Sequence, residues 1–447
     1  MPDTSPPSPN ADGTGSRARI QVVGLGADGW DGLAPGAREI VLSAHVVLGG
    51  ARHLALLPPV PGQRREPWPS PLRAGLPALL ASLNADDADI GDTDIGDAGP
   101  DGTGTHRTAG DVVALASGDP LLSGIGTTLI EVLGPGAVSV VPAVSSVALA
   151  RAELGWAAES CAVVSVTRGD PSLVLRELAP GRRVLVLSAD ERTPAQVAGL
   201  LTDAGYGASA MTVLGDLGSD RASRISATAG TWQAGHGQAE PGPTGVPRLN
   251  IIALELAGPR AGGWVAGLPD DVFEHDGQLT KRDLRASALA RLAPAPGERL
   301  WDVGAGAGSV GIEWMRAHPA CTATAVEANP ERAARIVRNA ARLGVPGLRV
   351  VTGRAPEALD GLPAPDAIFV GGGVTRDGVL DSCLAALRPG GRLVVHGVTL
   401  ETERLLADSY NRHGGELTRI AVETAAPIGS FTGWSPARTV TQWSFTR

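Results

Sequence analysis

Short apolar runs alternate with longer amphipathic stretches along this chain. Residues 20–25 and 112–116 are such runs in the N-terminal half, and residues 300–303, 323–326 and 367–370 are such runs in the C-terminal half. A continuous apolar run of this length predicts a strand buried on both faces, and the amphipathic stretches between the runs predict helices. Alternation of the two elements is typical of sheets covered by helices. The pattern therefore predicts an α/β fold in both halves.

The clearest local signal is the glycine-rich turn after the strand predicted at residues 300–303. Gly304, Gly306 and Gly308 follow the strand, and Ser309 is the expected N-cap of the next helix. Glycines permit a tight turn and a close approach of the backbone to a ligand. Glu327 ends the next predicted strand, near the spacing at which an acidic side chain binds ribose hydroxyls. This combination predicts a site for an adenosine-containing cofactor.

The spacing of the glycines separates two classes of cofactor. A dinucleotide fingerprint reads Gly-x-Gly-x-x-Gly and holds a pyrophosphate, whereas this loop reads Gly-x-Gly-x-Gly and is preceded by Asp302. The pattern resembles the class I methyltransferases that use S-adenosylmethionine (SAM), whose ammonium and sulfonium suit an acidic neighbour. A NAD-type dinucleotide and a turn without any ligand are the alternatives. The residues expected to contact SAM in this domain are Thr280, Gly304, Ala305, Gly306, Ala307, Gly308, Glu327, Arg354 and Ala355.

The N-terminal half carries three motifs in a fixed order. They are Gly24-x-Gly26, Ala116-Ser-Gly-Asp-Pro120 and Val141-Pro-Ala-Val-Ser-Ser146. In this order they resemble the tetrapyrrole methylase family, whose members have two α/β lobes and bind SAM in the cleft between them. The resemblance implies that SAM is bordered by Gly118, Asp119, Pro120, Ser145 and Ser146, and that Gly24 and Gly26 face the substrate. One departure is Thr167, which stands where the subfamily usually has histidine.

Motifs in the C-terminal half extend the resemblance. Residues 279–285 read Leu-Thr-Lys-Arg-x-x-Arg, and residues 369–373 and 429–436 carry two further motifs. They resemble the C-terminal half of the precorrin-6Y C(5,15)-methyltransferase (decarboxylating) family. A tetrapyrrole methylase domain placed before a class I SAM methyltransferase domain of Rossmann-like fold matches that family along nearly the whole chain.

The resemblance implies a bifunctional SAM-dependent enzyme of cobalamin biosynthesis with one SAM site in each domain. Such an enzyme methylates carbons 5 and 15 of precorrin-6B and decarboxylates the carbon-12 acetate, which gives precorrin-8X. Lys281, Arg282 and Arg285 then become candidates for binding substrate carboxylates, or else form a solvated basic face. The alternative is a SAM methyltransferase acting on RNA or another small molecule, with a degenerate, non-catalytic N-terminal domain.

These signals divide the chain into four parts. We expect a disordered tail at residues 1–18, a tetrapyrrole methylase domain at 19–258, a linker at 259–268 and a class I methyltransferase domain at 269–447. Residues 84–110, inside the first domain, are rich in Asp, Gly and Thr and are expected to form a disordered insertion.

Composition excludes several other functions. The net charge of −9 argues against a general nucleic-acid-binding protein. The three cysteines are scattered without metal-ligand spacing, so we expect reduced thiols and no metal site. The chain has neither a long apolar segment nor a signal peptide, which predicts no membrane association and a cytoplasmic location.

No catalytic triad or metal constellation is evident, so the catalytic residues are unknown and positioning is the expected mode of catalysis. The resemblance also implies a homo-oligomer.

Overall fold

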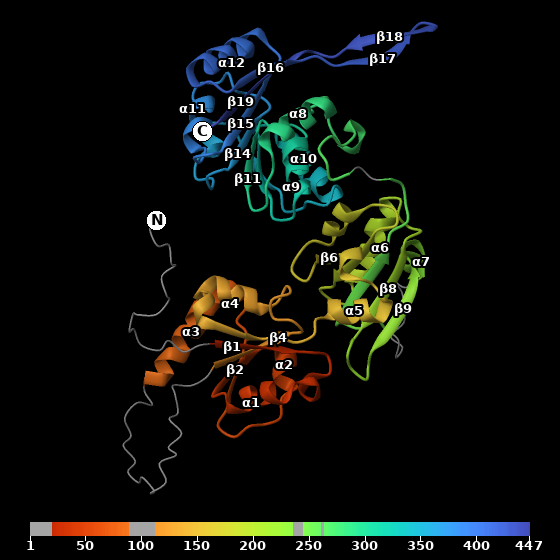
Figure 1. Cartoon of the computed structure of the whole chain (residues 1–447), viewed down its shortest axis with the longest axis vertical. Helices are drawn as coiled ribbons and strands as arrows, with labels where there is room; N and C mark the ends of the chain where they lie inside the picture. Colours follow the sequence, from red (N-terminus) through yellow and green to blue (C-terminus); the bar gives the residue numbers. More distant parts are fainter. Residues whose placement is uncertain (1–19, 89–111, 236–244, 261–262) are drawn as a thin grey trace, which may run out of the picture.

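The structure, a computed structural model, describes residues 20–88, 112–235, 245–260 and 263–447. Within these ranges the chain forms three large β-sheets with helices packed against them, in sequence order (Figure 1). The predicted tail at residues 1–18 lies outside the described residues, as does most of the predicted insertion at 84–110. Helix α3 (Leu72–Ala88) continues five residues into the range predicted to be disordered, so that prediction is wrong for residues 84–88.

The first lobe is a five-stranded parallel sheet in the order β3-β2-β4-β1-β5. Its inner strands β1, β2 and β4 are largely apolar, and Val22, Val47 and Ala114 are fully buried, whereas the edge strand β3 is charged. The elements are β1 (Ile20–Leu25), η1 (Gly29–Gly32), α1 (Pro35–Ser43), β2 (Val46–Gly49), α2 (Ala51–Ala55), β3 (Arg64–Pro67), α3, β4 (Val112–Ser117), α4 (Ile125–Leu133), η2 (Pro135–Ala137) and β5 (Val138–Val141).

The second lobe is a mixed sheet in the order β6-β7-β10-β8-β9, in which only β6 and β7 run parallel. Neither β6 nor β9 was predicted, and polar residues alternate along β9. The elements are α5 (Ser146–Leu154), η3 (Ala158–Ser160), β6 (Cys161–Ser165), η4 (Pro171–Glu177), β7 (Arg183–Leu187), α6 (Thr193–Asp203), β8 (Ala210–Gly215), β9 (Ser223–Thr228), α7 (Ala229–Gly235) and β10 (Asn250–Glu255).

The C-terminal domain is a seven-stranded sheet in the order β13-β12-β11-β14-β15-β19-β16, with β19 antiparallel to both neighbours. The order reverses next to β11, which creates a crevice at the carboxyl ends of the parallel strands. The elements up to β14 are η5 (Asp270–Val272), α8 (Arg282–Leu292), β11 (Arg299–Val303), α9 (Ser309–Ala317), β12 (Thr322–Glu327), α10 (Pro330–Arg342), β13 (Arg349–Thr352), η6 (Glu357–Leu359) and β14 (Ala367–Val370). The remaining elements are α11 (Val379–Ala386), β15 (Arg392–Gly397), α12 (Leu400–His413), β16 (Glu416–Ile420), β17 (Glu423–Ile428), β18 (Phe431–Pro436) and β19 (Val440–Thr446).

One helix start differs from the sequence prediction. Helix α9 begins at Ser309, but its N-cap is Gly308, which adopts a left-handed φ of 76°. Helix α8 begins at Arg282 with Lys281 as N-cap. Neither N-cap residue forms a side-chain cap hydrogen bond.

Strands β17 and β18 form a separate two-stranded hairpin that projects from the C-terminal domain (Figure 1). Three large apolar side chains on it are exposed, namely Ile428 at 62%, Phe431 at 79% and Trp434 at 70%. We call residues 423–436 the arm. An isolated hairpin has little stability of its own.

The second lobe contacts the C-terminal domain through η4. The Arg176 guanidinium donates to the carbonyl of Arg316, 3.1 Å away, and Trp264 donates to the carbonyl of Arg176 at 3.2 Å. Gly344, after α10, lies so close to the backbone of Arg176 that a Cβ there would collide with it. No helix among the described residues combines the length and apolar character needed to cross a membrane.

Candidate functional sites in the two domains

The larger cavity of the protein, about 720 Å³, opens at the carboxyl ends of the parallel strands of the C-terminal domain. Strands β11, β12 and β15 contribute Val303, Glu327 and His396, and Gly371 follows β14. A ligand in an open α/β sheet binds at this edge, beside the strand at which the order reverses. The cavity therefore lies where the fold favours binding of a small molecule.

The glycine turn after β11 forms one wall of this cavity. Gly304, Gly306 and Gly308 all have positive φ, at 69°, 59° and 76°. A Cβ on Gly304 would lie 2.6 Å from the Gly372 carbonyl oxygen, and one on Gly306 would lie 2.8 Å from that of Gln278. Gly304, Ala305 and Gly306 line the cavity, whereas Ala307 and Gly308 do not. Glycine is therefore required here both by conformation and by space.

Glu327 connects the turn to the next strand. Its side chain is only 6% exposed, and one carboxylate oxygen accepts a hydrogen bond from the backbone of Gly306 at 2.8 Å. The other oxygen accepts from the backbone of Asn329 at 2.9 Å. A carboxylate has about four lone-pair sites, so it can fix both loops and still accept hydroxyl groups from a ligand.

Asp302 does not lie where a direct contact with the ligand would require it. It is 1% exposed, does not line the cavity, and accepts a hydrogen bond from the backbone of Gly311 in the first turn of α9 at 2.9 Å. Burial, with Glu327 nearby, raises its pKa to about 7. The role of Asp302 is therefore to hold the helix start below the turn.

Cations dominate the charged part of the cavity wall. Its charged lining residues are one glutamate, Glu327, and five cations, namely Lys281, Arg332, Arg354, Arg376 and Arg438. Arg332 is paired with Asp276 at 2.9 Å and Arg376 with Glu357 at 2.8 Å. No described carboxylate lies within 4.0 Å of Arg354 or Arg438. In a chain of net charge −9 this wall is suited to a ligand with several carboxylates.

The sequence predicted part of this wall and misassigned another part. Lys281, Thr280, Arg354 and Ala355 line the cavity, whereas Arg282 does not. Arg285 is fully buried: it bonds Glu313 at 2.5 Å and Asp270 at 3.3 Å, and it also donates to two backbone carbonyls. Its guanidinium is thus fully engaged inside the protein, so the prediction of a substrate contact for Arg285 is wrong. The motif at residues 279–285 does not indicate which of its three basic residues faces the interior of the protein.

His396 and Arg438 are residues of the wall that sequence reasoning did not assign. His396 is 9% exposed and packs edge-to-face against Phe369, with ring centroids 5.0 Å apart. The amide nitrogen of buried Gln442 donates to its Nε2 at 2.9 Å, an orientation that also lets Gln442 accept from Arg291. Burial lowers the pKa of His396, which keeps the ring neutral. Arg438 follows the arm directly, a position that no local motif marks.

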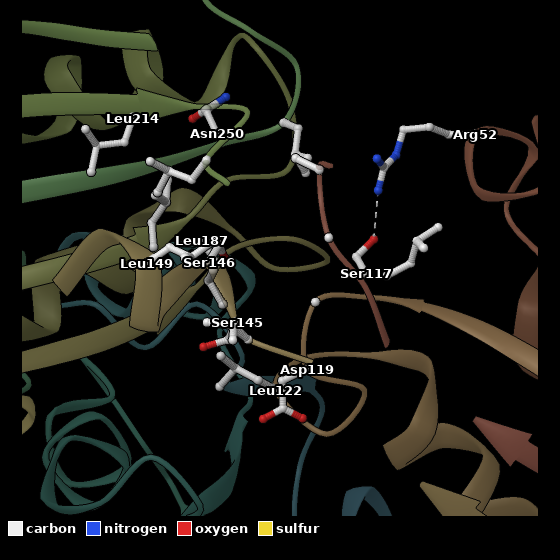
Figure 2. A pocket seen from close by; sticks show the side chains of 18 residues that line it. Arg52, Ser117, Asp119, Leu122, Ser145, Ser146, Leu149, Leu187, Leu214 and Asn250 are labelled. Carbon is white, nitrogen blue, oxygen red and sulfur yellow. Dashed lines mark hydrogen bonds between the residues drawn. The ribbon is translucent and has the colours of Figure 1, made fainter. Parts of the chain in front are cut away.

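A second, narrower cavity of about 90 Å³ lies between the two N-terminal lobes (Figure 2). From the first lobe Ser117, Gly118 and Asp119 reach it at the end of β4, and from the second lobe Leu214 and Ile251 close it. Further lining residues are Leu25, Gly26, Ala27, Arg52, Leu122, Val144, Ser145, Ser146, Leu149, Leu187, Leu217, Leu249 and Asn250. An apolar slot with a few polar groups is the usual environment of an adenosine-type ligand.

The predicted N-terminal residues divide into cavity-lining and structural ones. Gly118 has a φ of 55° and lines the cavity, and Ser145 lines it while capping α5 through a hydrogen bond from Ala148. Gly24 and Pro120 do not line it. A Cβ on Gly24 would collide with the Gly118 carbonyl oxygen, so this glycine allows the backbone after β4 to pack closely against β1.

Thr167 lies in the loop between β6 and η4. Its side chain is exposed, its hydroxyl lies 3.1 Å from that of Ser165, and it is not among the residues lining the cavity. The departure at this position therefore leaves the lining of the cavity unchanged.

Comparisons with known proteins cover both halves of the chain. Residues 19–232 match the family described as tetrapyrrole (corrin/porphyrin) methylases, and residues 271–447 match the family described as precorrin methyltransferase domain. A Sinorhizobium protein named precorrin-6Y C(5,15)-methyltransferase (decarboxylating) is 43% identical over 431 residues, 96% of each chain. A Salmonella typhimurium protein named cobalt-precorrin-6B C(15)-methyltransferase (decarboxylating) is 37% identical over 118 residues, 26% of this chain and 60% of that one. The solved C-terminal domain of precorrin-6Y C5,15-methyltransferase from Rhodobacter capsulatus is 44% identical and covers 42% of this chain, with a TM-score of 0.40.

Proposed function

Because the chain belongs to the precorrin-6Y C(5,15)-methyltransferase (decarboxylating) family, we propose that it methylates carbons 5 and 15 of precorrin-6B and decarboxylates the carbon-12 acetate to give precorrin-8X. The observation that carries this proposal is the extent of the similarity, which spans 96% of both chains and therefore includes both domains. Methylases of this family use SAM as methyl donor. The alternative of an RNA or unrelated small-molecule substrate is not supported by any of these relatives.

One SAM site in each domain is the arrangement we propose. In the C-terminal domain the turn at Gly304 and Gly306, with Glu327 behind it, forms a backbone cradle of the kind SAM requires. In the N-terminal domain the slot between Gly118, Ser145 and the leucines of the second lobe has the composition of an adenosine site. Each candidate site faces its own cavity, which suits two transfers to distant ring positions.

The work of the protein in this reaction is positioning. Bound SAM supplies an electrophilic methyl group on a sulfonium, so an electron-rich ring carbon can form the new bond without a strong protein nucleophile. The backbone at Gly304 and Gly306 and the Glu327 carboxylate would fix the donor, while the cationic wall would fix the substrate. In the decarboxylation the bond to the acetate carboxyl breaks, carbon dioxide leaves, and the macrocycle takes the electron pair. Because His396 is buried and neutral, it adds no charge that would oppose the departure of carbon dioxide.

We assign carbon 15 methylation and decarboxylation to the C-terminal domain, and carbon 5 methylation to the N-terminal domain. The shorter Salmonella relative is consistent with a division of labour, because its name combines carbon 15 methylation with decarboxylation and omits carbon 5, in a protein that aligns with only 26% of this chain. The wide cavity with Arg354 and Arg438 free to bind carboxylates also suits the step in which an acetate must be held.

Mass spectrometry of the product tests the function. Purified protein incubated with precorrin-6B and SAM should yield a product that has gained two methyl groups and lost one carbon dioxide. Transfer of one methyl group with loss of carbon dioxide would show that the N-terminal domain does not act on this substrate. SAM binding without any change in the tetrapyrrole would contradict the proposed function.

We also propose that the protein is a homo-oligomer assembled through the arm. Ile428, Phe431 and Trp434 expose large apolar side chains on a hairpin that has no core of its own, with the paired Ile428 and Phe431 on one face and Trp434 on the other. Replacement of Phe431 and Trp434 by Ser should lower the molar mass measured by light scattering while the folded domain remains. An unchanged mass would contradict the proposal, and Val265→Ser, at another exposed apolar position, is the control.

A further inference from the structure

Arg52 reaches the N-terminal cavity from the first lobe. It is the second residue of α2, directly after β2, and it lines the cavity together with Ser117 (Figure 2). The opposite wall, from the second lobe, is formed largely by apolar side chains such as Leu187 and Leu214. Arg52 is exposed to solvent, so its guanidinium remains accessible to a ligand.

Two neighbours fix the orientation of this guanidinium. The Nη2 atom of Arg52 lies 2.8 Å from Nε2 of His53 and 3.4 Å from the hydroxyl of Ser117, and Nε2 and that hydroxyl are 3.0 Å apart. A guanidinium only donates hydrogen bonds, so Nε2 of His53 must accept and the ring must be neutral. Burial first, and the charge of Arg52 second, lower the pKa of His53 to about 4. The imidazole therefore acts as a fixed acceptor over the whole neutral range.

The guanidinium of Arg52 forms no ion pair with any of the described residues. No described carboxylate lies within 4.0 Å of it, although Asp119 is also part of the cavity lining. Burial lowers the pKa of Arg52, Asp216 from the second lobe raises it, and Arg221 lowers it again. A partly buried cation of fixed orientation, with donors left over and no anion beside it, is matched by a ligand carboxylate.

We propose that Arg52 binds a carboxylate of the ligand in the N-terminal cavity and that His53 is a positioning residue that holds the guanidinium in place. The inference rests on the proposed function, because that function brings two carboxylate sources into this cavity. One is the amino-acid part of SAM and the other is an acetate or propionate side chain of the tetrapyrrole. Both offer the same planar anion to the guanidinium.

Arg52→Gln tests the proposal in the full-length protein, with precorrin-6B and SAM as substrates. The variant should lose about 10- to 100-fold in the rate of one of the two methyl transfers, the cost of a hydrogen bond to a charged group. Arg52→Lys keeps the charge without the planar fork and should recover part of the loss. Arg73→Gln removes an exposed arginine of the same lobe that pairs with Glu131, and is the matched control.

The decarboxylating transfer in the same molecules is the internal control. It should continue at the wild-type rate in Arg52→Gln, which shows that the chain is folded and that the proposed function holds. Two full methyl transfers by Arg52→Gln, at the rates of Arg73→Gln, would overturn the role of Arg52 while leaving the proposed function intact. Failure of the wild-type protein to methylate would instead contradict the proposed function.

Binding measurements distinguish the two carboxylate sources. They use a Glu327→Ala background, so that the N-terminal site dominates the titration. If Arg52 binds the SAM carboxylate, Arg52→Gln should weaken SAM binding about 10-fold or more and leave binding of decarboxylated SAM unchanged. If it binds the tetrapyrrole, SAM binding should be unchanged and the KM for precorrin-6B in the affected transfer should rise. Unchanged values of all three quantities would overturn the proposal.

The positioning role of His53 predicts a contrast between two substitutions. Gln offers an acceptor oxygen to Arg52, whereas Leu fills a similar volume without one. His53→Gln should therefore keep most of the affected transfer, and His53→Leu should show the kinetic defect of Arg52→Gln. Equal activity of the two variants would mean that the ring only fills space, and would overturn the positioning role.

Discussion

The glycine pair at the end of the first strand of the N-terminal domain packs partly against the protein itself, whereas the glycine turn of the C-terminal domain faces a cavity. Gly24 lies inside β1, against the backbone of Gly118, and only Gly26 reaches the cavity lining. Gly304 and Gly306 both line their cavity and have positive φ. Glycine thus permits close packing beside a strand in one domain and exposes backbone to a ligand in the other.

The two cavities also differ in size and charge. The N-terminal one is narrow, about 90 Å³, and has one cation, Arg52, and one carboxylate, Asp119, among its lining residues. The C-terminal one is about 720 Å³ and has five cations and one carboxylate. A slot between two lobes depends on both sheets, whereas a crevice at one sheet edge leaves room for a large substrate. The difference indicates that the C-terminal domain holds more of the charged substrate.

The largest expected effect tests whether Arg285 is a buried structural residue or part of the cationic wall of the C-terminal cavity. Arg285→Met should lower the free energy of unfolding by about 3–5 kcal/mol, because it leaves the buried Glu313 carboxylate without its cation. Chemical denaturation followed by fluorescence measures this, with the exposed Arg282→Gln as control. A raised KM for precorrin-6B without loss of stability would contradict the structural role and return Arg285 to the cavity wall.

The next effect tests whether the C-terminal glycine turn, unlike the N-terminal one, depends on glycine to contact the methyl donor. Gly306→Val should reduce the decarboxylating transfer at least about 100-fold, since a side chain at this φ strains the loop and displaces the carbonyl of Gln278. SAM binding by calorimetry should lose one of two sites. Gly347→Ala, where a Cβ would meet only Met315 at 3.9 Å, should behave like the wild type. Full activity of Gly306→Val would mean that this turn does not contact the donor.

A smaller effect tests the charge difference between the cavities. Arg438→Gln should raise the KM for precorrin-6B about 10-fold in the decarboxylating transfer, since it removes one charge-assisted hydrogen bond at an exposed site. The matched control is Arg412→Gln, an exposed arginine in the last turn of α12 that does not line the cavity. An equal rise of KM in both variants would indicate a general effect of net charge instead of a specific contact.

Much of the fold could be predicted from the sequence because strand and loop signals are local. The strands on either side of the turn at Gly304 follow from short patterns of apolar residues and glycine and are confirmed. Strand β9 was missed because polar residues alternate along it at the edge of its sheet. Edge strands lack the continuous apolar runs on which the prediction depended.

The sites were predicted less completely, because their walls are assembled from distant segments. Arg52 and Ser117 meet across 65 residues, and Arg438 enters its cavity only because the chain returns from the arm. The inward turn of Arg285 depends on Glu313, 28 residues away, which no motif marks. Local sequence reports backbone conformation well, but it does not report which charged side chain finds a buried partner.

The last prediction concerns the strand below each glycine turn. Strand β1 contains no ionisable residue, whereas β11 contains Asp302, whose pKa burial raises to about 7. The folded state therefore retains a proton that the unfolded chain has already lost, so the stabilisation is complete below pH 3.8 and disappears as the pH rises through 7. Between pH 6 and 8 the wild type should lose about 1 kcal/mol of unfolding free energy more than Asp302→Asn.

The asparagine retains an acceptor for the backbone of Gly311, so Asp302→Asn removes the titration and preserves the helix start. Urea denaturation at several pH values measures the difference, and Asp360→Asn, at an exposed aspartate of the same domain, corrects for general charge effects. Parallel stability curves for Asp302→Asn and the wild type would mean that the carboxyl group is already ionised in the folded protein at pH 6. In that case Asp302 would carry its negative charge below the C-terminal turn throughout this pH range. The two domains would then differ in the fixed charge beneath their glycine turns, and not in the uptake of a proton.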